Sequence, residues 1–339
     1  MNQSTVVLAL NQVSTRTYWL STAIGGQLLL IKSRPPYLGL LPRLVAILVR
    51  NRSRRVVVQL PVGPLLLGVL LTRIFCKRFT LLADVHTGFL MAGLNFSKHG
   101  ALNAPFIGLL RHVDRIILHN EANLSLLPRG LSRKALILYD PFYALHGSIR
   151  MKSSSSTMTT RDYALFPASW HPDEPIEFLI RTWVDAGIPF PLLITGKPRG
   201  PLLKKVNSML EDAPNVKLTG YLDYDDYLDM AAGSKLIISA TTSEMDAQCS
   251  AYEALALGKP ILATSTSVLR AILDGGAVYF DLADPSTLVS ALKRVLINYD
   301  ACRSAAIGRA DSLERKTRTS ISAEFELPAT AHASLPAAT

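Results

Sequence analysis

Short runs of apolar residues alternate along the chain with segments of helical length. The runs are rich in Val, Ile and Leu on both faces, which is typical of parallel strands buried between crossover helices. In the first half of the chain we expect strands at residues 6–10, 27–33, 55–60, 79–86, 115–120 and 135–140. In the second half we expect them at residues 163–169, 191–196, 216–222, 235–242, 260–265 and 277–281. The pattern predicts the α/β fold class, with two Rossmann-like doubly wound domains.

Two polar stretches mark the predicted domain boundaries. Residues 150–162, RMKSSSSTMTTRD, are rich in Ser and Thr and have no periodicity, so we expect a linker there. Residues 317–339 are rich in Ala, Ser, Thr and Pro and predict a disordered tail. These limits give an N-terminal domain at residues 1–149 and a C-terminal domain at residues 163–316.

The two halves of the chain differ in charge. Residues 1–150 contain 18 Lys and Arg and four acidic residues, whereas the remainder contains 18 basic and 22 acidic residues. A basic half attracts phosphates, whether in nucleic acid, in anionic lipid headgroups or in a pyrophosphate-linked acceptor. We expect no nucleic-acid partner, because no aromatic platform is interleaved with the basic residues. The densest cluster, at residues 43–55, follows an amphipathic segment and is compatible with a solvated helix end or a membrane-surface patch.

The chain lacks the uninterrupted apolar run of about 18 residues that a membrane-spanning helix needs. Its longest candidate, at residues 60–71, contains Pro61, Gly63 and Pro64, and it favours a strand end followed by a core helix, with a membrane-dipping helix as the alternative. The N-terminus does not resemble a secretory signal. The three cysteines are far apart, which favours a reduced compartment and argues against a zinc site. We therefore expect a cytoplasmic protein, with peripheral contact to the inner face of the membrane as an open possibility.

Polar residues at strand ends are the candidates for chemistry, because doubly wound domains bind ligands at the carboxyl ends of their strands. In the first half, Asp84 and His86 end a predicted strand, and Thr87 and Gly88 follow. An imidazole accepts a proton near neutral pH and a glycine allows close approach, so the pattern predicts a catalytic or substrate-orienting loop. A histidine that is hydrogen-bonded to backbone at a strand end is an equal alternative.

His119 and Asn120 lie at the next such junction, in the sequence HNEANLSLLP. Here the favoured interpretation is structural, because Asn120 or Glu121 could cap or charge the start of a helix. In the second half, Ser169 lies in the loop ASWHPDEP, where a phosphate or a sugar could bind. Gly196 ends the next strand and precedes Lys197 in a basic loop that suits a diphosphate. Neither a P-loop nor a GxGxxG motif is present.

The segment ISATTSEMDAQCSAYEALALGKPILAT contains a strand end, a loop with Glu244 and Asp246, and an apolar helix. The helix carries Glu253 and ends at Gly258. An early glutamate could merely complement the helix dipole, which is worth about 0.3–1 kcal/mol. However, so apolar a helix must be packed nearly all round, and a buried carboxylate needs a partner. A carboxylate in a strand-end crevice suits the two hydroxyls of a ribose.

The segments SAYEALALGKPILAT and VKLTGYLDYDDYLDMAAGSKLIISATT resemble the C-terminal domain of the GT-B glycosyltransferases, specifically the large retaining family that uses nucleotide-sugar donors. The resemblance covers residues 163–296 well, and the first half only through ADVHTG and HNEANLSLL. The chain is also distantly similar to the mannosyltransferases that extend lipid-linked chitobiose. This resemblance implies two Rossmann-like domains that face a cleft.

The resemblance also implies roles for individual residues. Glu253 matches the second of two family glutamates and would hold the donor ribose, while the first falls at Met245, between Glu244 and Asp246. The other implied donor-binding residues are Tyr221 or Leu222 against the base and Ser169, Gly196 and Lys197 near the diphosphate. On the acceptor side the resemblance implies His86 as the acceptor-domain histidine near the sugar. From the strand-end pattern we expect His86 and Asp84 to be catalytic, with Thr87, Gly88, His119 and Asn120 on the acceptor side.

The implied activity is transfer of a hexosyl unit from a nucleoside-diphosphate sugar to a glycan or polyprenyl-linked acceptor. The family implies no metal and no cofactor, because cationic side chains and a helix N-terminus stabilise the leaving diphosphate. From charge alone, the basic N-terminal half would face an acceptor at the anionic membrane surface. Two alternatives are a nucleotide-sugar epimerase on the same scaffold and a non-catalytic glycosyltransferase-like subunit, which Met245 favours.

Overall fold

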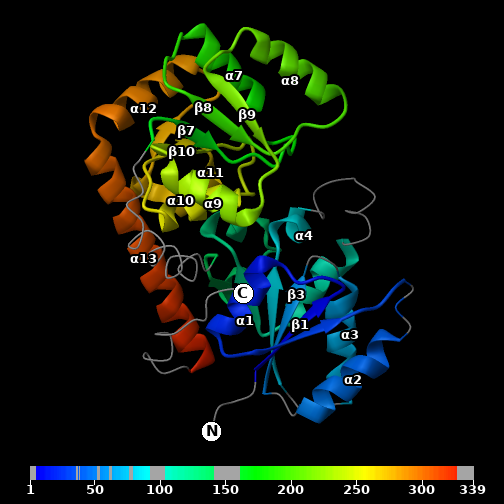
Figure 1. The fold of residues 1–339 in the computed structure, drawn as a ribbon. Helices are drawn as coiled ribbons and strands as arrows, with labels where there is room; N and C mark the ends of the chain where they lie inside the picture. Colours follow the sequence, from blue (N-terminus) through cyan, green and yellow to red (C-terminus); the bar gives the residue numbers. More distant parts are fainter. Residues whose placement is uncertain are drawn as a thin grey trace. The chain divides into compact units, whose positions relative to one another are not determined.

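Parallel strands organise both halves of the chain, as the hydrophobic pattern predicts (Figure 1). The computed structural model describes residues 5–35, 37, 39–51, 54–60, 63–75, 79–91, 104–140 and 161–326. Each of the twelve predicted strands is present at its predicted place, which confirms the α/β fold class. The chain divides into two units, Met1–Pro141 with Arg315–Thr339 and Phe142–Glu314. Within these described ranges no helix combines the length and the apolar character needed to cross a membrane.

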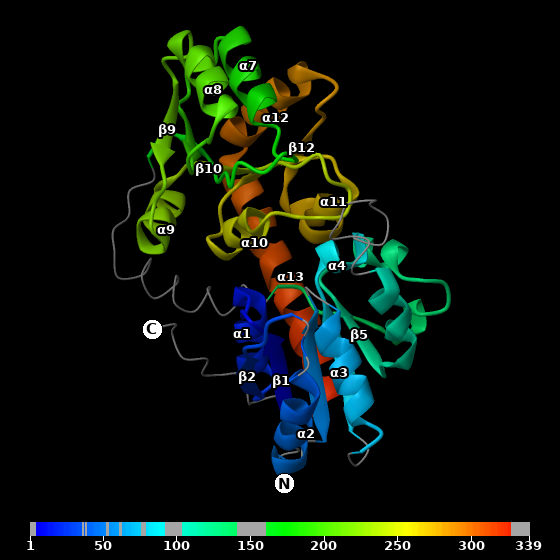
Figure 2. The same cartoon turned by 90° about the vertical axis from the view of Figure 1, so that its right-hand side faces the viewer.

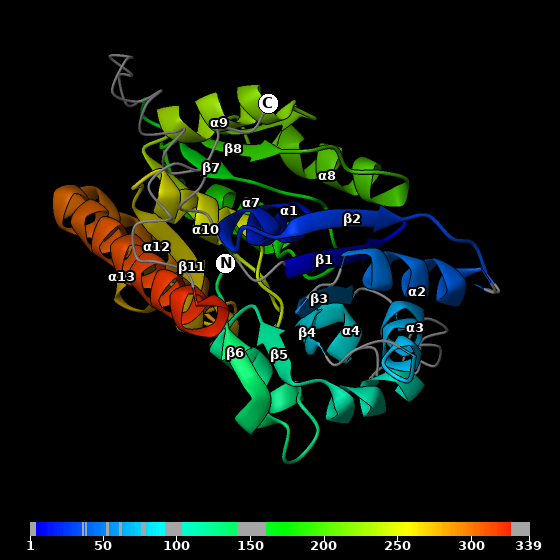
Figure 3. The ribbon, with the colours of Figure 1, turned by 90° about the horizontal axis from the view of Figure 1, so that it is seen from below.

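The first unit contains a parallel sheet with helices on both faces. Its strands are β1 (Thr5–Leu10), β2 (Gln27–Ile31), β3 (Arg55–Leu60), β4 (Thr80–Val85), β5 (Arg115–Leu118) and β6 (Ala135–Ile137), in the order β2-β1-β3-β4-β5-β6. Its helices are α1 (Thr15–Ala23), α2 (Leu40–Asn51), α3 (Pro64–Thr72) and α4 (Thr87–Met91), with 3₁₀ turns at Gly108–His112, Glu121–Leu126 and Ser132–Lys134. Because strand residues alternate between faces, Val56 and Val58 pack with α2 and α3, and Val57 packs with α1. Figure 3 shows these helices on the two sides of the sheet.

The C-terminal helix α13 (Tyr299–Phe325) corrects the prediction of a disordered tail from residue 317. Its last turns are helical because Ile321 and Phe325 are buried in the core of the first unit. Arg115 also donates a hydrogen bond of 3.0 Å to Glu324. The predicted domain limits, 1–149 and 163–316, therefore miss this return of the chain to the first unit. Most of the predicted linker, 150–162, and the end of the predicted tail, 327–339, lie outside the described residues.

The second unit contains a parallel sheet with the Rossmann strand order. Its strands are β7 (Ala164–Phe166), β8 (Leu192–Thr195), β9 (Val216–Gly220), β10 (Leu236–Ser239), β11 (Ile261–Thr264) and β12 (Val278–Phe280), in the order β12-β11-β10-β7-β8-β9. Its helices are α7 (Ile176–Asp185), α8 (Pro201–Glu211), α9 (Tyr224–Gly233), α10 (Cys249–Ala256), α11 (Ser267–Leu273) and α12 (Pro285–Ile297). Figure 2 shows α7, α8 and α12 on one side of this sheet and α10 and α11 on the other. The strand order reverses between β7 and β10, where sheets of this kind bind ligands.

The GKP sequence ends α10 and returns the chain to β11. Gly258 adopts a φ of +59°, and a Cβ there would lie 3.0 Å from the Ile307 side chain. The Gly258 N–H donates to the Leu255 carbonyl and the Lys259 N–H to the Ala254 carbonyl, which is the pairing of a Schellman motif. The positive φ therefore favours glycine at this position, and the motif fixes where α10 ends.

Candidate functional site

A pocket of about 440 Å³ opens at the carboxyl ends of β7 and β10, where the strand order of the second unit reverses. It is lined by the loop after β7, by Thr195 at the end of β8, by Tyr227 of α9 and by the start of α10. Of the predicted donor-binding residues, the structure brings Ser169, Asp246 and Glu253 to this pocket. The pocket therefore lies at strand ends where the sequence predicts ligand-binding residues.

Glu174 organises the loop after β7. Its buried carboxylate accepts hydrogen bonds from the backbone N–H groups of Ser169 at 3.0 Å, Trp170 at 2.6 Å and His171 at 3.2 Å. It also accepts one from the Ser169 hydroxyl at 2.8 Å. The sequence places Ser169 in a loop where a phosphate or a sugar could bind. Instead, the carboxylate occupies the donors that Ser169 was predicted to offer to a diphosphate.

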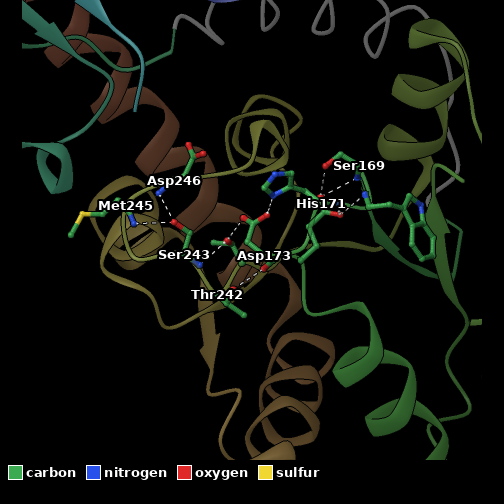
Figure 4. A network of polar contacts seen from close by, with 10 residues as sticks. Ser169, His171, Asp173, Thr242, Ser243, Met245 and Asp246 are labelled. Carbon is green, nitrogen blue, oxygen red and sulfur yellow. Dashed lines mark hydrogen bonds and ion pairs between the residues drawn. The ribbon is translucent and has the colours of Figure 1, made fainter. Parts of the chain in front are cut away.

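Asp173 joins the loop after β7 to the loop after β10 (Figure 4). The Thr241 hydroxyl donates to its carboxylate at 2.7 Å, and the Thr242 N–H donates to its backbone carbonyl at 2.8 Å. The ring of His171 hydrogen-bonds to the same carboxylate. Burial raises the pKa of Asp173, but the hydrogen bonds from Thr241 and His171 outweigh it and hold the pKa below its ordinary value. Asp173 is therefore ionised at neutral pH and holds the two strand-end loops together.

Glu253 extends from α10 toward the pocket and accepts a hydrogen bond from the Tyr227 hydroxyl. The buried carboxylate therefore has the partner that the sequence requires. Burial raises the pKa of Glu253, although the Tyr227 hydrogen bond acts in the opposite direction. An acid whose charge is poorly solvated is a strong acceptor for hydroxyl groups that enter the pocket.

The N-terminus of α10 also faces the pocket, since Cys249 and Ser250 line it. The first N–H groups of a helix have no partner within the helix and carry the positive end of its dipole, so they attract anions. Gln248 precedes the helix, and its side chain does not cap it. Both polar atoms of the Gln248 amide are shielded from solvent and lack a hydrogen-bond partner in the part of the chain that the structure describes. Helix and amide together offer donors to an anionic group.

The backbone of Gly196 lies close to the Ala168 carbonyl and to the Trp170 ring, beside the pocket. Gly196 has a φ of +74°, and a Cβ there would lie 2.4 Å from the Ala168 carbonyl and 2.8 Å from the Trp170 ring. Gly196 is thus required by the tryptophan, which explains this glycine without a diphosphate. Lys197 is exposed, Tyr221 is 85% exposed, and neither these residues nor Leu222 line the pocket.

The loop after β10 separates the two acids that flank Met245. The Glu244 carboxylate accepts a hydrogen bond of 2.7 Å from the Ser267 N–H at the start of α11, and bonding to Ser267 lowers its pKa. Asp246 lines the pocket, and its N–H donates to the Ser243 hydroxyl at 2.9 Å. The Met245 side chain points away from Asp173 (Figure 4). Of the two flanking acids, the structure therefore brings Asp246 to the pocket.

In the first unit, the predicted catalytic residue Asp84 is fully buried and paired with Arg16. Arg16 Nε donates to Asp84 at 3.2 Å, its Nη1 donates to Asp140, and its Nη2 donates to the Leu138 carbonyl at 2.8 Å. Sequence analysis missed Arg16 and Asp140, because nothing in the local pattern connects a residue of α1 with the ends of β4 and β6. The contacts make Asp84 a positioning group for the strand ends of this sheet.

His86 and His119 lie beside this ion pair, with their ring centroids 5.2 Å apart and their planes at 68°. Burial lowers the pKa of both imidazoles, most strongly for His119, and the charge of Arg16 acts in the same direction. Both rings are therefore neutral at pH 7. His86 Nε2 is buried and has no hydrogen-bond partner in the described ranges.

The remaining predicted acceptor-side residues have local structural roles or lie at the surface. Asn120 accepts a hydrogen bond of 3.2 Å from the Asn123 N–H and caps a 3₁₀ turn, as the structural interpretation expects. The Thr87 hydroxyl contacts the Asn123 side chain at 3.2 Å. Gly88 is exposed on α4. Across the described residues, no three His, Cys, Asp or Glu side chains cluster in a way that could hold a metal ion.

Residues 161–298 match the model of the family described as Glycosyl transferases group 1, and no curated protein matches the chain. Among solved structures, HepE from Anabaena in complex with UDP is 12% identical, with a TM-score of 0.71 over 95% of this chain and 98% of its own. The lipopolysaccharide outer core galactosyltransferase WaaB is 12% identical, with a TM-score of 0.65 over 94% of this chain and 99% of its own. UDP-GlcNAc 2-epimerase from Methanocaldococcus jannaschii is 13% identical, with a TM-score of 0.54 over 86% and 92%.

At these identities the solved structures show the fold alone, and they confirm a GT-B fold class with two Rossmann-like domains. The epimerase shares the fold, so fold alone does not separate it from a transferase. The family match covers residues 161–298, which include the pocket-lining residues of the second unit from Pro167 to Glu253.

Proposed function

We propose that this chain, a GT-B glycosyltransferase whose residues 161–298 form a group 1 glycosyl transferase domain, moves a hexosyl unit from a UDP-sugar to a glycan or polyprenyl-linked acceptor. The observation that carries the proposal is the pocket between β7 and β10, which combines the N-terminus of α10 with the buried Glu253 carboxylate. HepE has been solved with UDP and with UDP-glucose, which favours uridine as the base.

In this proposal the diphosphate binds at the N-terminus of α10. The unpaired amide of Gln248 donates to it, and the helix dipole stabilises the negative charge that develops on the leaving group. Glu253 accepts hydrogen bonds from the ribose hydroxyls, and Tyr227 holds its carboxylate in place. Asp246 contacts the hexosyl unit, since it is the acid from the β10 loop that lines the pocket. Stabilising the leaving diphosphate in this way requires no metal ion.

The acceptor is assigned to the first unit. His86 would offer a neutral imidazole, with one buried nitrogen that lacks a partner in the described residues, to a sugar hydroxyl. Asp84 would keep its strand end in position through Arg16. The excess of basic residues in residues 1–150 supports an acceptor that carries pyrophosphate, at the cytoplasmic surface of an anionic membrane.

A transfer assay tests this function. The protein is incubated with UDP-glucose or UDP-galactose labelled in the sugar, with and without a polyprenyl-pyrophosphate glycan. We expect release of UDP and a labelled acceptor only when both substrates are present. Conversion of the UDP-sugar to a different UDP-sugar in the absence of acceptor would indicate an epimerase. Binding of the UDP-sugar without any product would indicate a non-catalytic subunit. If UDP-, GDP- and ADP-sugars all leave the melting temperature unchanged, the donor pocket is wrongly assigned.

A further inference from the structure

Helix α2 presents apolar residues on two faces. Leu40, Leu44 and Leu48 are buried, and α2 packs closely on α3, where a Cβ on Gly68 would lie 2.6 Å from Leu44. This inward stripe accounts for the helix as part of the core of the first unit. It does not account for a second apolar stripe, at Leu41, Val45 and Val49.

The second stripe lines an open groove of about 530 Å³ with Phe75, which follows α3. Phe75 is 69% exposed and its neighbour Ile74 is 73% exposed, and Val49 is also exposed. We call Val45, Val49, Ile74 and Phe75 the α2–α3 apolar face. Large side chains exposed together in this way, next to an apolar groove, mark a surface for interaction.

Cationic side chains border the α2–α3 apolar face, and the acid Asp114 is held in an ion pair by Arg73, the residue before Ile74. Arg50 lines the groove, and Arg43 and Arg54 are exposed at the two ends of the same segment. Residues 1–83 contain eleven Lys and Arg and no Asp or Glu. Arg16 and Arg55 are committed to the ion pairs with Asp84 and Glu326, whereas Arg50 borders the groove itself.

We propose that the α2–α3 apolar face binds an anionic phospholipid bilayer, with Ile74 and Phe75 inserted among the acyl chains and Arg50 at the level of the headgroups. An amphipathic helix with an apolar side and arginines at its edge is suited to the membrane interface. A face bordered by exposed arginines, with Asp114 paired to Arg73, complements an anionic bilayer, whereas a protein partner would have to be acidic around an apolar centre. The inference deepens the proposed function, on which it rests, because it assigns the membrane contact to one face of the first unit.

Vesicle co-sedimentation tests the proposal. The full chain is mixed with phosphatidylcholine vesicles that contain or lack phosphatidylglycerol, and bound protein is measured at low and high salt. We expect binding only to the anionic vesicles, weakened by salt because exposed charges are screened. The double variant Ile74→Glu/Phe75→Glu should bind at least about tenfold more weakly, given the apolar area that it no longer inserts. Arg50→Glu should also weaken binding, and more so at low salt.

Ile297→Glu is the matched control, because Ile297 is 81% exposed on α12 of the second unit. It should bind vesicles as the unaltered protein does. The proposal is overturned if the unaltered chain does not sediment with anionic vesicles, if it binds neutral vesicles equally well, or if the double variant binds as strongly. The melting temperature of each variant, with and without UDP, is measured in parallel. The donor pocket lies in the second unit. If UDP raises the melting temperature as expected but the protein does not bind vesicles, this inference is overturned and the donor proposal stands.

Discussion

Replacing Glu253 with Gln separates the two roles of this carboxylate, because glutamine keeps the shape and removes the charge. In the ligand-free protein, burial raises the pKa of Glu253, so folding favours the protonated form. Ionisation at neutral pH therefore costs stability, and the stability present below the ordinary pKa is lost as the pH rises through the folded value. We expect Glu253→Gln to keep or raise the free energy of unfolding at pH 7 and to weaken UDP binding.

The expected loss of affinity follows from the hydrogen bonds to the ribose. A hydrogen bond to a charged group contributes about 1.5–3 kcal/mol, and glutamine retains only a neutral acceptor in its place. A loss of about 2–3 kcal/mol corresponds to a dissociation constant about 30- to 150-fold higher. At a UDP concentration of about a hundredfold the original dissociation constant, binding stabilises the unaltered protein by about 2.7 kcal/mol. The variant should gain less than about 1 kcal/mol under the same conditions.

Thermal unfolding and isothermal titration, each with and without UDP, measure both effects. Glu211→Gln is the control, because Glu211 is exposed at the end of α8 and does not line the pocket. It should change neither the unfolding nor the UDP affinity. The reasoning would be refuted by a Glu253→Gln protein that binds UDP with its original affinity. It would also be refuted by a large loss of stability without ligand, since that would make the carboxylate a structural group.

Three further predictions concern the supports of the two strand-end regions. Gly196→Ala should lower the free energy of unfolding by about 1–3 kcal/mol, from the positive φ and the contact with the Ala168 carbonyl, and urea denaturation measures it. Because burial lowers the pKa of His119, the unfolded state binds more protons; stability should be intact above pH of about 6.5 and fall as the pH decreases below it. His119→Gln should flatten this fall in unfolding curves recorded between about pH 5 and 7.5. Arg16→Met should cost about 3–5 kcal/mol in the same assay, because it leaves Asp84 buried without its partner cation.

The strands could be predicted from sequence because their signal is local. All six residues of β3 are buried, and its central Val56, Val57 and Val58 are apolar on both faces of the sheet. The end of α13 could not be predicted, since its sequence has little periodicity of its own. Ile321 and Phe325 are ordered by a core built from residues more than two hundred positions earlier, such as Val57. Contacts between residues so far apart in the sequence produce no pattern within a short stretch of sequence.

The site shows the same limit on a smaller scale. The sequence pointed to the ends of β7 and β10, where the pocket lies, because the strand order of a doubly wound sheet favours ligand binding there. It did not indicate which group satisfies each donor there. Glu174 takes the N–H groups of the β7 loop, and Glu244 takes one at the start of α11. Which carboxylate bonds to which N–H depends on the path of each loop, and a spacing pattern does not contain that path.

The hydrogen bonds that these carboxylates accept limit how Met245 could affect the proposed activity. In the proposed binding mode, with the β7 loop closed around Glu174, the diphosphate would bind the N-terminus of α10 and Gln248, and neither depends on residue 245. The ribose would bind Glu253, whose partner is Tyr227. The methionine therefore bears on the hexosyl contact alone. Asp246 lines the pocket one residue later, so a carboxylate remains available for that contact, and the substitution alone is a weak argument for a chain without activity.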